Sequence, residues 1–141
     1  MTRLIRLAAL VFVGFVCGGA FASEEEFVAL HKVSLSGDAG KPFGEVHATI
    51  ETTKDRQDRR IKSITLRVNG KEVAVPKEQF SDLKHPLLRT AEFRTEGGRD
   101  NQGPWLYLTF QLAKPETGSL SRVYLRFRNG KLLERSIHDS Q

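Results

Sequence analysis

The chain has 141 residues, one cysteine and a formal net charge of +5 at pH 7. This length is that of one ordinary domain, and a single cysteine excludes an intramolecular disulfide. The positive excess is too small to predict nucleic-acid binding from charge alone.

Residues 1–22 are predicted to be a secretory signal peptide. Arg3 and Arg6 supply the positive end, residues 7–16 supply the apolar run, and the small-x-small sequence at 20–22 supplies a cleavage signal. A bilayer span needs about 20 apolar residues, so this run favours a signal peptide over a membrane anchor. We therefore expect an exported protein, periplasmic in the first instance, with secretion as the alternative.

Cleavage after residue 22 leaves one mature domain at 23–141, with no transmembrane helix. The domain loses Cys17 and two arginines, so its net charge falls from +5 to +3 and thiol chemistry is excluded. Lipidation of Cys17 is an alternative, but residues 14–16 lack the leucine and the small residue expected before a lipidated cysteine.

The first part of the mature chain predicts two strands separated by a glycine-rich loop. Residues 27–36 place Ala29, His31, Val33 and Leu35 on one face, where His31 is expected to be a hydrogen-bonded core histidine. Residues 37–44 contain three glycines and a proline and predict the loop. Residues 45–52 alternate cleanly, with Val46, Ala48 and Ile50 pointing inward.

The most informative stretch is residues 64–75, with Asn-Gly at 69–70. Asn-Gly favours a two-residue type I′ turn, which predicts a β-hairpin. The predicted pairs are Val68 with Lys71, Arg67 with Glu72, Leu66 with Val73 and Ile64 with Val75. The charged run 54–62 before this hairpin is expected to be a solvated connection.

The rest of the chain predicts one short helix after Pro76 and four more strands. The strands are expected at 90–95, 105–112, 120–128 and 132–137, and their alternating apolar residues mark one buried face. A second Asn-Gly at 129–130 predicts a hairpin whose register stays open. A two-residue turn sets Leu125 opposite Glu134, whereas a longer loop with a bulge sets it opposite Leu133.

These elements predict an all-β fold: an antiparallel β-sandwich or partly open barrel of about seven or eight strands with one short helix. Turn signals recur every 8 to 12 residues, as such folds require. The two Asn-Gly hairpins differ in spacing by one residue and are not an internal repeat.

Catalytic and metal-binding signals are weak. The sequence has no Gly-x-Ser-x-Gly elbow, no phosphate-binding loop and no evident carboxylate pair, so we expect neither catalysis nor a cofactor. His47 and Glu51 share one face of a predicted strand and are ligand types for zinc or copper. A metal-handling protein or a small envelope enzyme centred on His47 and Glu51 is therefore one alternative.

The strongest binding signal is a set of aromatic and arginine side chains opposite the predicted core. Tryptophan, tyrosine and arginine are enriched at binding hot spots because they bury a large area and keep a polar group. The glycine-rich loop 97–103 lies at the rim of this face and offers hydrogen-bonding groups. The candidate binding residues are Arg94, Arg99, Asp100, Trp105, Tyr107, Tyr124 and Arg126.

The sequence thus predicts an exported, non-catalytic binding protein of the cell envelope or secreted fraction. Its partner is expected to be a protein, an envelope glycan or an anionic polymer, and export argues against nucleic acid. An enzyme inhibitor that acts through loop 37–44 or 97–103 is the remaining alternative.

Overall fold

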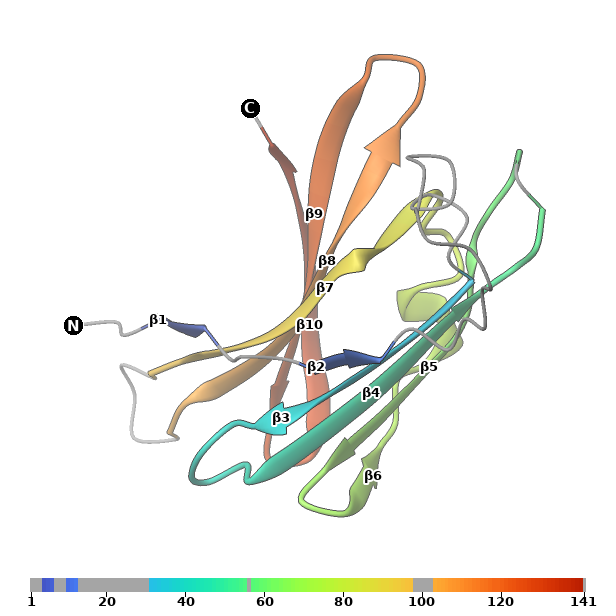
Figure 1. Ribbon diagram of the computed structural model, residues 1–141. Helices are drawn as coiled ribbons and strands as arrows, with labels where there is room; N and C mark the ends of the chain where they lie inside the picture. Colours follow the sequence, from blue (N-terminus) through green and yellow to red (C-terminus); the bar gives the residue numbers. More distant parts are fainter. Residues whose placement is uncertain (1–3, 7–9, 13–30, 56, 98–102, 141) are drawn as a thin grey trace.

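The computed structural model describes residues 4–6, 10–12, 31–55, 57–97 and 103–140 (Figure 1). From residue 31 onward the fold is an antiparallel sandwich of eight strands, which confirms the predicted class. The strands are β3 (Lys32–Asp38), β4 (Glu45–Thr52), β5 (Ile61–Val68), β6 (Lys71–Val73), β7 (Pro86–Glu96), β8 (Trp105–Lys114), β9 (Ser119–Arg128) and β10 (Lys131–Ser140).

The strands form two layers in chain order. Strands β3–β6 make the first sheet, here called the N-sheet, and β7–β10 make the second, here called the C-sheet. Within each sheet, every strand pairs with the next one along the chain, and the segment from β6 to β7 crosses from the N-sheet to the C-sheet. Figure 1 shows the N-sheet in cyan to green and the C-sheet in yellow to red.

Two short strands from the N-terminal segment extend these sheets. β1 (Leu4–Arg6) pairs with the end of β7, and β2 (Leu10–Phe12) pairs with β3. Both are dark blue in Figure 1. They fall within residues 1–22, whose role as a signal peptide stays a prediction.

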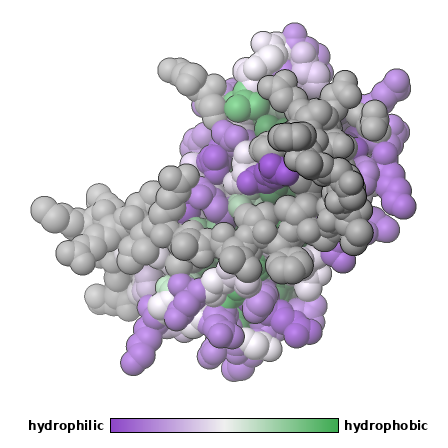
Figure 2. Space-filling view, viewed as in Figure 1, coloured by the Kyte–Doolittle hydropathy of each residue, from purple (hydrophilic) through white to green (hydrophobic). Residues whose placement is uncertain are grey.

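The core lies between the two sheets and is built mainly from alternate residues of each strand, although Thr109 in β8 is buried as well. In β8, Leu106, Leu108 and Phe110 are fully buried, and they face buried residues of the N-sheet such as Ile50 and Leu66. Burying each such side chain contributes about 1.5–3 kcal/mol. Consistent with an interior core, hydrophilic residues cover most of the coloured surface in the view of Figure 2.

The central hairpin forms with the predicted register up to Val73. Asn69 and Gly70 have φ of 52° and 76°, as a type I′ turn requires, and Leu66 lies opposite Val73. Strand β6 ends at Val73, so the expected pair of Ile64 with Val75 is absent. Val75 instead packs half-buried against the core.

The predicted short helix is a single 3₁₀ turn, η1 (Lys77–Gln79), which follows Pro76. Phe80 and Leu83 after it are buried in the core. Arg135 of β10 fixes this segment from the other sheet, because its guanidinium donates to both carboxylate oxygens of Asp82 at 2.6 and 3.1 Å. The segment therefore packs against the core of the sandwich.

Two expectations about single residues were wrong. His31 is exposed just before β3 and is not part of the core, because the buried face of that strand begins at Val33. Arg59 lies in the charged run expected to be solvated, yet its side chain is only 4% exposed. Arg59 lies two residues before β5 and is held close to the sandwich. Its backbone carbonyl accepts a hydrogen bond from the His85 amide.

The second Asn-Gly hairpin follows neither predicted register in full, because Leu125 lies opposite neither Glu134 nor Leu133. Asn129 and Gly130 form a two-residue turn with positive φ, and Leu132 lies opposite Phe127. A bulge then follows between Leu132 and Glu134, so Leu125 lies opposite Arg135. Beyond the bulge, alternate residues of β10 lie on the outer face of the C-sheet.

Candidate functional site

The outer face of the C-sheet carries a row of polar and aromatic side chains that crosses four strands. In this row Arg94 of β7 lies opposite Tyr107 of β8, Tyr107 opposite Arg126 of β9, and Arg126 opposite Glu134 of β10. Because residues directly opposite in antiparallel strands point to the same face, the register itself brings these four side chains together.

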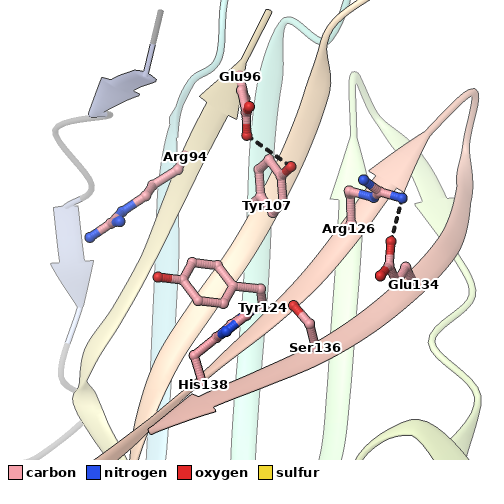
Figure 3. Close-up of a pocket in the computed structure, with 8 residues that line it drawn as sticks. All are labelled: Arg94, Glu96, Tyr107, Tyr124, Arg126, Glu134, Ser136 and His138. Carbon is pink, nitrogen blue, oxygen red and sulfur yellow. Dashed lines mark hydrogen bonds and ion pairs between the residues drawn. The ribbon is translucent and has the colours of Figure 1, made fainter. Parts of the chain in front are cut away.

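These side chains line a hollow of about 390 Å³ on the outer face, shown in Figure 3. Every strand of the C-sheet contributes to it. The lining residues are Arg94, Glu96, Tyr107, Tyr124, Arg126, Glu134, Ser136 and His138. Its volume lies within the range of about 300–1,000 Å³ typical of small-ligand sites.

Aromatic side chains form the floor of the hollow. The rings of Tyr107 and Tyr124 meet edge to face, with centroids 6.2 Å apart and planes at 86°. The ring of Tyr124 meets His138 in the same way, at 5.6 Å and 74°. Figure 3 shows Tyr124 across the middle of the hollow, between Arg94 and His138. Such edge-to-face contacts hold the rings in a defined arrangement.

The hydroxyl of Tyr107 is held by a carboxylate. It donates a hydrogen bond of 3.0 Å to Oε2 of Glu96. Burial, together with this hydrogen bond to the negative Glu96 carboxylate, raises the pKa of Tyr107 above its ordinary value of 10.0. Tyr107 therefore stays protonated at neutral pH as a donor to Glu96.

Both arginines of the hollow are engaged in ion pairs. Arg126 pairs with Glu134 across β9 and β10, and Nη2 of Arg94 lies 2.5 Å from Oε1 of Glu92. Arg122 approaches the same Glu92 oxygen at 3.7 Å. The side chains of Arg94 and Glu92 are 19% and 16% exposed, so this pair is less screened by solvent than a surface pair.

Trp105 lies beside the hollow rather than in its wall. The guanidinium carbons of Arg126 and Arg128 lie 4.0 and 3.4 Å from the centroid of its ring. Arg128, which is 4% exposed, also donates a hydrogen bond of 2.9 Å to the carbonyl of Gly103. The Trp105 ring thus supports Arg126, which lines the hollow, through cation–π contact.

Four of the seven predicted binding residues meet in the hollow: Arg94, Tyr107, Tyr124 and Arg126. Trp105 contacts one of them from the side. Arg99 and Asp100 lie outside the described residues, as does most of loop 97–103. The structure thus brings four of the seven residues together, while a binding role for any of the seven stays a prediction.

Sequence reasoning missed four lining residues: Glu96, Glu134, Ser136 and His138. Glu96 ends a strand that was expected to stop at 95. The other three belong to β10, and their placement depends on the bulge after Leu132. The alternate spacing of Glu134, Ser136 and His138 could have predicted that they share one face. Which face this is depends on the position of the bulge, which the sequence does not give.

The alternative metal site at His47 and Glu51 lies on the outer face of β4, in the other sheet. His47 is exposed and lies opposite Arg67, whose positive charge disfavours a bound cation. Among the described residues, no three His, Cys, Asp or Glu side chains are grouped as a metal site would require. In the same part of the chain, no helix has the length and apolar character to cross a membrane.

A second hollow, of about 500 Å³, lies near the segment between η1 and β7. Three of its carboxylates, those of Asp58, Asp82 and Asp139, form ion pairs that hold this segment and the end of β10 in place. A hydrogen bond from Arg135 to the Asp82 carboxylate lowers the pKa of Asp82. Hydrogen bonds from Lys114 and Ser121 to the Asp139 carboxylate lower the pKa of Asp139. This hollow thus contains contacts that support the fold.

No family model, curated protein or solved structure matches this chain.

Proposed function

We propose that this chain is an exported, non-catalytic binding protein, periplasmic or secreted, and that the hollow on the outer face of the C-sheet is its binding site. One observation carries the proposal: aromatic and charged side chains from all four strands converge on one hollow. Tyrosine and arginine are the residue types that dominate binding energy at recognition sites. Export is inferred from the signal sequence in residues 1–22.

The absence of catalysis is part of the same proposal. Ser136 and His138 both line the hollow, but in the described part of the structure no hydrogen bond joins them, as one would in a serine activated by a histidine. Glu96 accepts from Tyr107 and Glu134 pairs with Arg126, so each carboxylate holds a neighbouring side chain in position and keeps further lone pairs that can accept from a ligand. These contacts favour a rigid recognition surface over acid–base chemistry.

The test is binding of the purified exported protein to an envelope fraction of the producing cells. Tyr124→Ala removes the ring at the centre of the hollow, and we expect it to abolish sedimentation with that fraction. His47→Ala alters an exposed residue of the N-sheet and is the matched control, which should bind like the wild type. Equal binding by both variants and the wild type would show that the hollow is not the site.

Export is tested separately by the mass of the protein recovered outside the cytoplasm. Cleavage after residue 22 gives a chain that begins at Ser23, and that mass is the expected result. A protein that stays in the cytoplasm would remove the basis for an envelope partner, whereas an exported protein that keeps residues 1–22 would support the membrane anchor over the signal peptide.

A further inference from the structure

The arginine and glutamate side chains that line the hollow have equal and opposite total charge, and this balance limits the kind of ligand that the hollow can bind. Arg94 and Arg126 contribute two positive charges, and Glu96 and Glu134 contribute two negative ones. An anionic ligand has to compete with Glu134 for Arg126 and with Glu92 for Arg94. An electrostatic site for a polyanion instead presents an excess of unpaired positive charge.

The hollow is equally unlike the centre of a protein–protein interface. Such centres are more apolar than the rest of the surface and are depleted in glutamate, aspartate and lysine, although tyrosine and arginine are enriched in them. Here half of the eight lining residues are charged. In the described part of the chain, the exposed large hydrophobic residues are Leu133 and Ile137, and neither lines the hollow.

The polar groups that line the hollow are suited to bind the hydroxyl groups of a ligand. Carboxylates accept hydrogen bonds, guanidiniums donate them, and the Ser136 hydroxyl does both. A sugar hydroxyl both donates and accepts, so neighbouring hydroxyls can bridge a carboxylate and a guanidinium such as those of Glu134 and Arg126. The donors Arg94 and Arg126 and the acceptor Glu134 lie along the cross-strand row of the C-sheet, and Glu96 beside this row is a second acceptor.

The tyrosine rings supply the apolar part of such a site. The face of an aromatic ring is negatively polarised and attracts the weakly positive C–H groups of a sugar ring. Figure 3 shows the broad face of the Tyr124 ring, flanked by the polar ends of Arg94 and His138. A ring with polar groups around its rim is the arrangement that a sugar ring requires.

We infer that the hollow binds an uncharged sugar unit of a glycan chain. This inference rests on the proposed function and narrows it from any envelope partner to a neutral saccharide. Tyr124 packs against the sugar ring, while Glu134, Arg126 and Ser136 bind its hydroxyls.

The experiment uses the purified exported protein and the envelope fraction, and it destroys one class of partner at a time. Periodate cleaves the carbon–carbon bond between neighbouring hydroxyls of sugars, and we expect it to reduce binding at least tenfold. Protease digestion of the envelope fraction, or about 0.5 M salt, which screens exposed charges to a few ångströms, should leave binding within about twofold. Loss of binding after protease or salt, with no effect of periodate, would overturn the inference.

Glu134→Gln adds an independent test because it frees Arg126 from its ion pair. If the ligand is a neutral sugar, this change weakens binding several-fold, because one strong acceptor is lost. If the ligand is a polyanion, the freed guanidinium strengthens binding, and dextran sulfate as a probe would show the gain. Stronger binding by Glu134→Gln would therefore contradict the inference.

These outcomes also separate the inference from the proposed function. Binding that Tyr124→Ala abolishes but periodate does not affect would keep the hollow as a binding site and reject the sugar. Absence of any binding by the wild-type protein to the untreated envelope fraction would reject both. Thermal unfolding of each variant confirms that the fold is retained.

Discussion

The guanidinium carbon of Arg128 lies 3.4 Å from the centroid of the Trp105 ring. This contact joins the last residue of β9 to the first residue of β8 and lies at the edge of the hollow. Because Arg126 lies against the same ring at 4.0 Å, Trp105 restricts the position of an arginine that lines the site. The single tryptophan therefore reports directly on this part of the molecule.

Replacing Arg128 by alanine is expected to destabilise the protein by about 2 kcal/mol. The change removes the cation–π contact and a charged hydrogen bond to the Gly103 carbonyl. Urea unfolding followed by Trp105 fluorescence measures the loss, and quenching by acrylamide should increase because the ring is uncovered. Arg67→Ala, on the exposed face of β5, is the control and should change stability by less than about 0.5 kcal/mol. Equal losses in both variants would contradict the packed role of Arg128.

The central hairpin requires glycine at position 70 because of its backbone conformation. A substitution there tests this requirement alone, since an added side chain would make no packing contacts. The φ of Gly70 is +76°, and no atom lies within 4 Å of where a Cβ would be placed. We expect Gly70→Ala to cost about 1 kcal/mol through backbone strain alone. Gly97→Ala is a matched control, since it also has open space but not the left-handed backbone. It should be neutral or stabilising by up to about 1 kcal/mol, because it restricts the unfolded chain. Equal effects of the two changes in urea unfolding would refute this assignment.

Much of the fold was predictable because local signals agreed with one another. In β8 the alternation of Leu106, Leu108 and Phe110 with polar residues defines the buried face, and these three are fully buried. The Asn69-Gly70 turn fixes the register of the first hairpin, and the structure confirms it through Val73. These signals involve neighbours in sequence, so they can be read without knowledge of the partner strand.

The site was only partly predictable because it depends on a bulge. Leu132 and Leu133 are adjacent apolar residues, and alternation alone does not say which of them faces the core. The bulge resolves the conflict by leaving Leu133 out of register and 53% exposed. Its position depends on packing between β9 and β10, and this packing in turn brings Glu134, Ser136 and His138 to the hollow.

The ion pair of Asp82 with Arg135 is expected to stabilise the protein in a pH-dependent way. Arg135 holds the pKa of Asp82 below its ordinary value of 3.8, through a hydrogen bond first of all. The stabilisation is therefore present above about pH 3.8 and is lost as the pH falls through the lowered folded-state pKa. Because the Asp82 side chain is 58% exposed, its size is that of a surface pair, about 0.2–1 kcal/mol.

Asp82→Asn tests this pair by urea unfolding at two pH values. The variant should be less stable than the wild type at neutral pH, and the difference should vanish in strong acid. Glu78→Gln changes an exposed carboxylate of the same segment and serves as the control, with little effect at either pH. A difference between wild type and Asp82→Asn that persists unchanged in acid would show that the charge is not responsible.

The Tyr107–Glu96 hydrogen bond predicts a tyrosine that ionises late. The chain has two tyrosines, so in a Tyr124→Phe variant the phenolate absorbance reports on Tyr107 alone. Its midpoint should lie above 10.0, because burial and the Glu96 carboxylate both disfavour the phenolate. Adding Glu96→Gln removes the negative acceptor and should lower the midpoint, although burial keeps part of the shift. Circular dichroism at each pH verifies that the fold persists. A midpoint that does not move with Glu96→Gln would mean that the Glu96 carboxylate does not raise the pKa of Tyr107. The hydrogen bond between these two side chains of the hollow would then be contradicted.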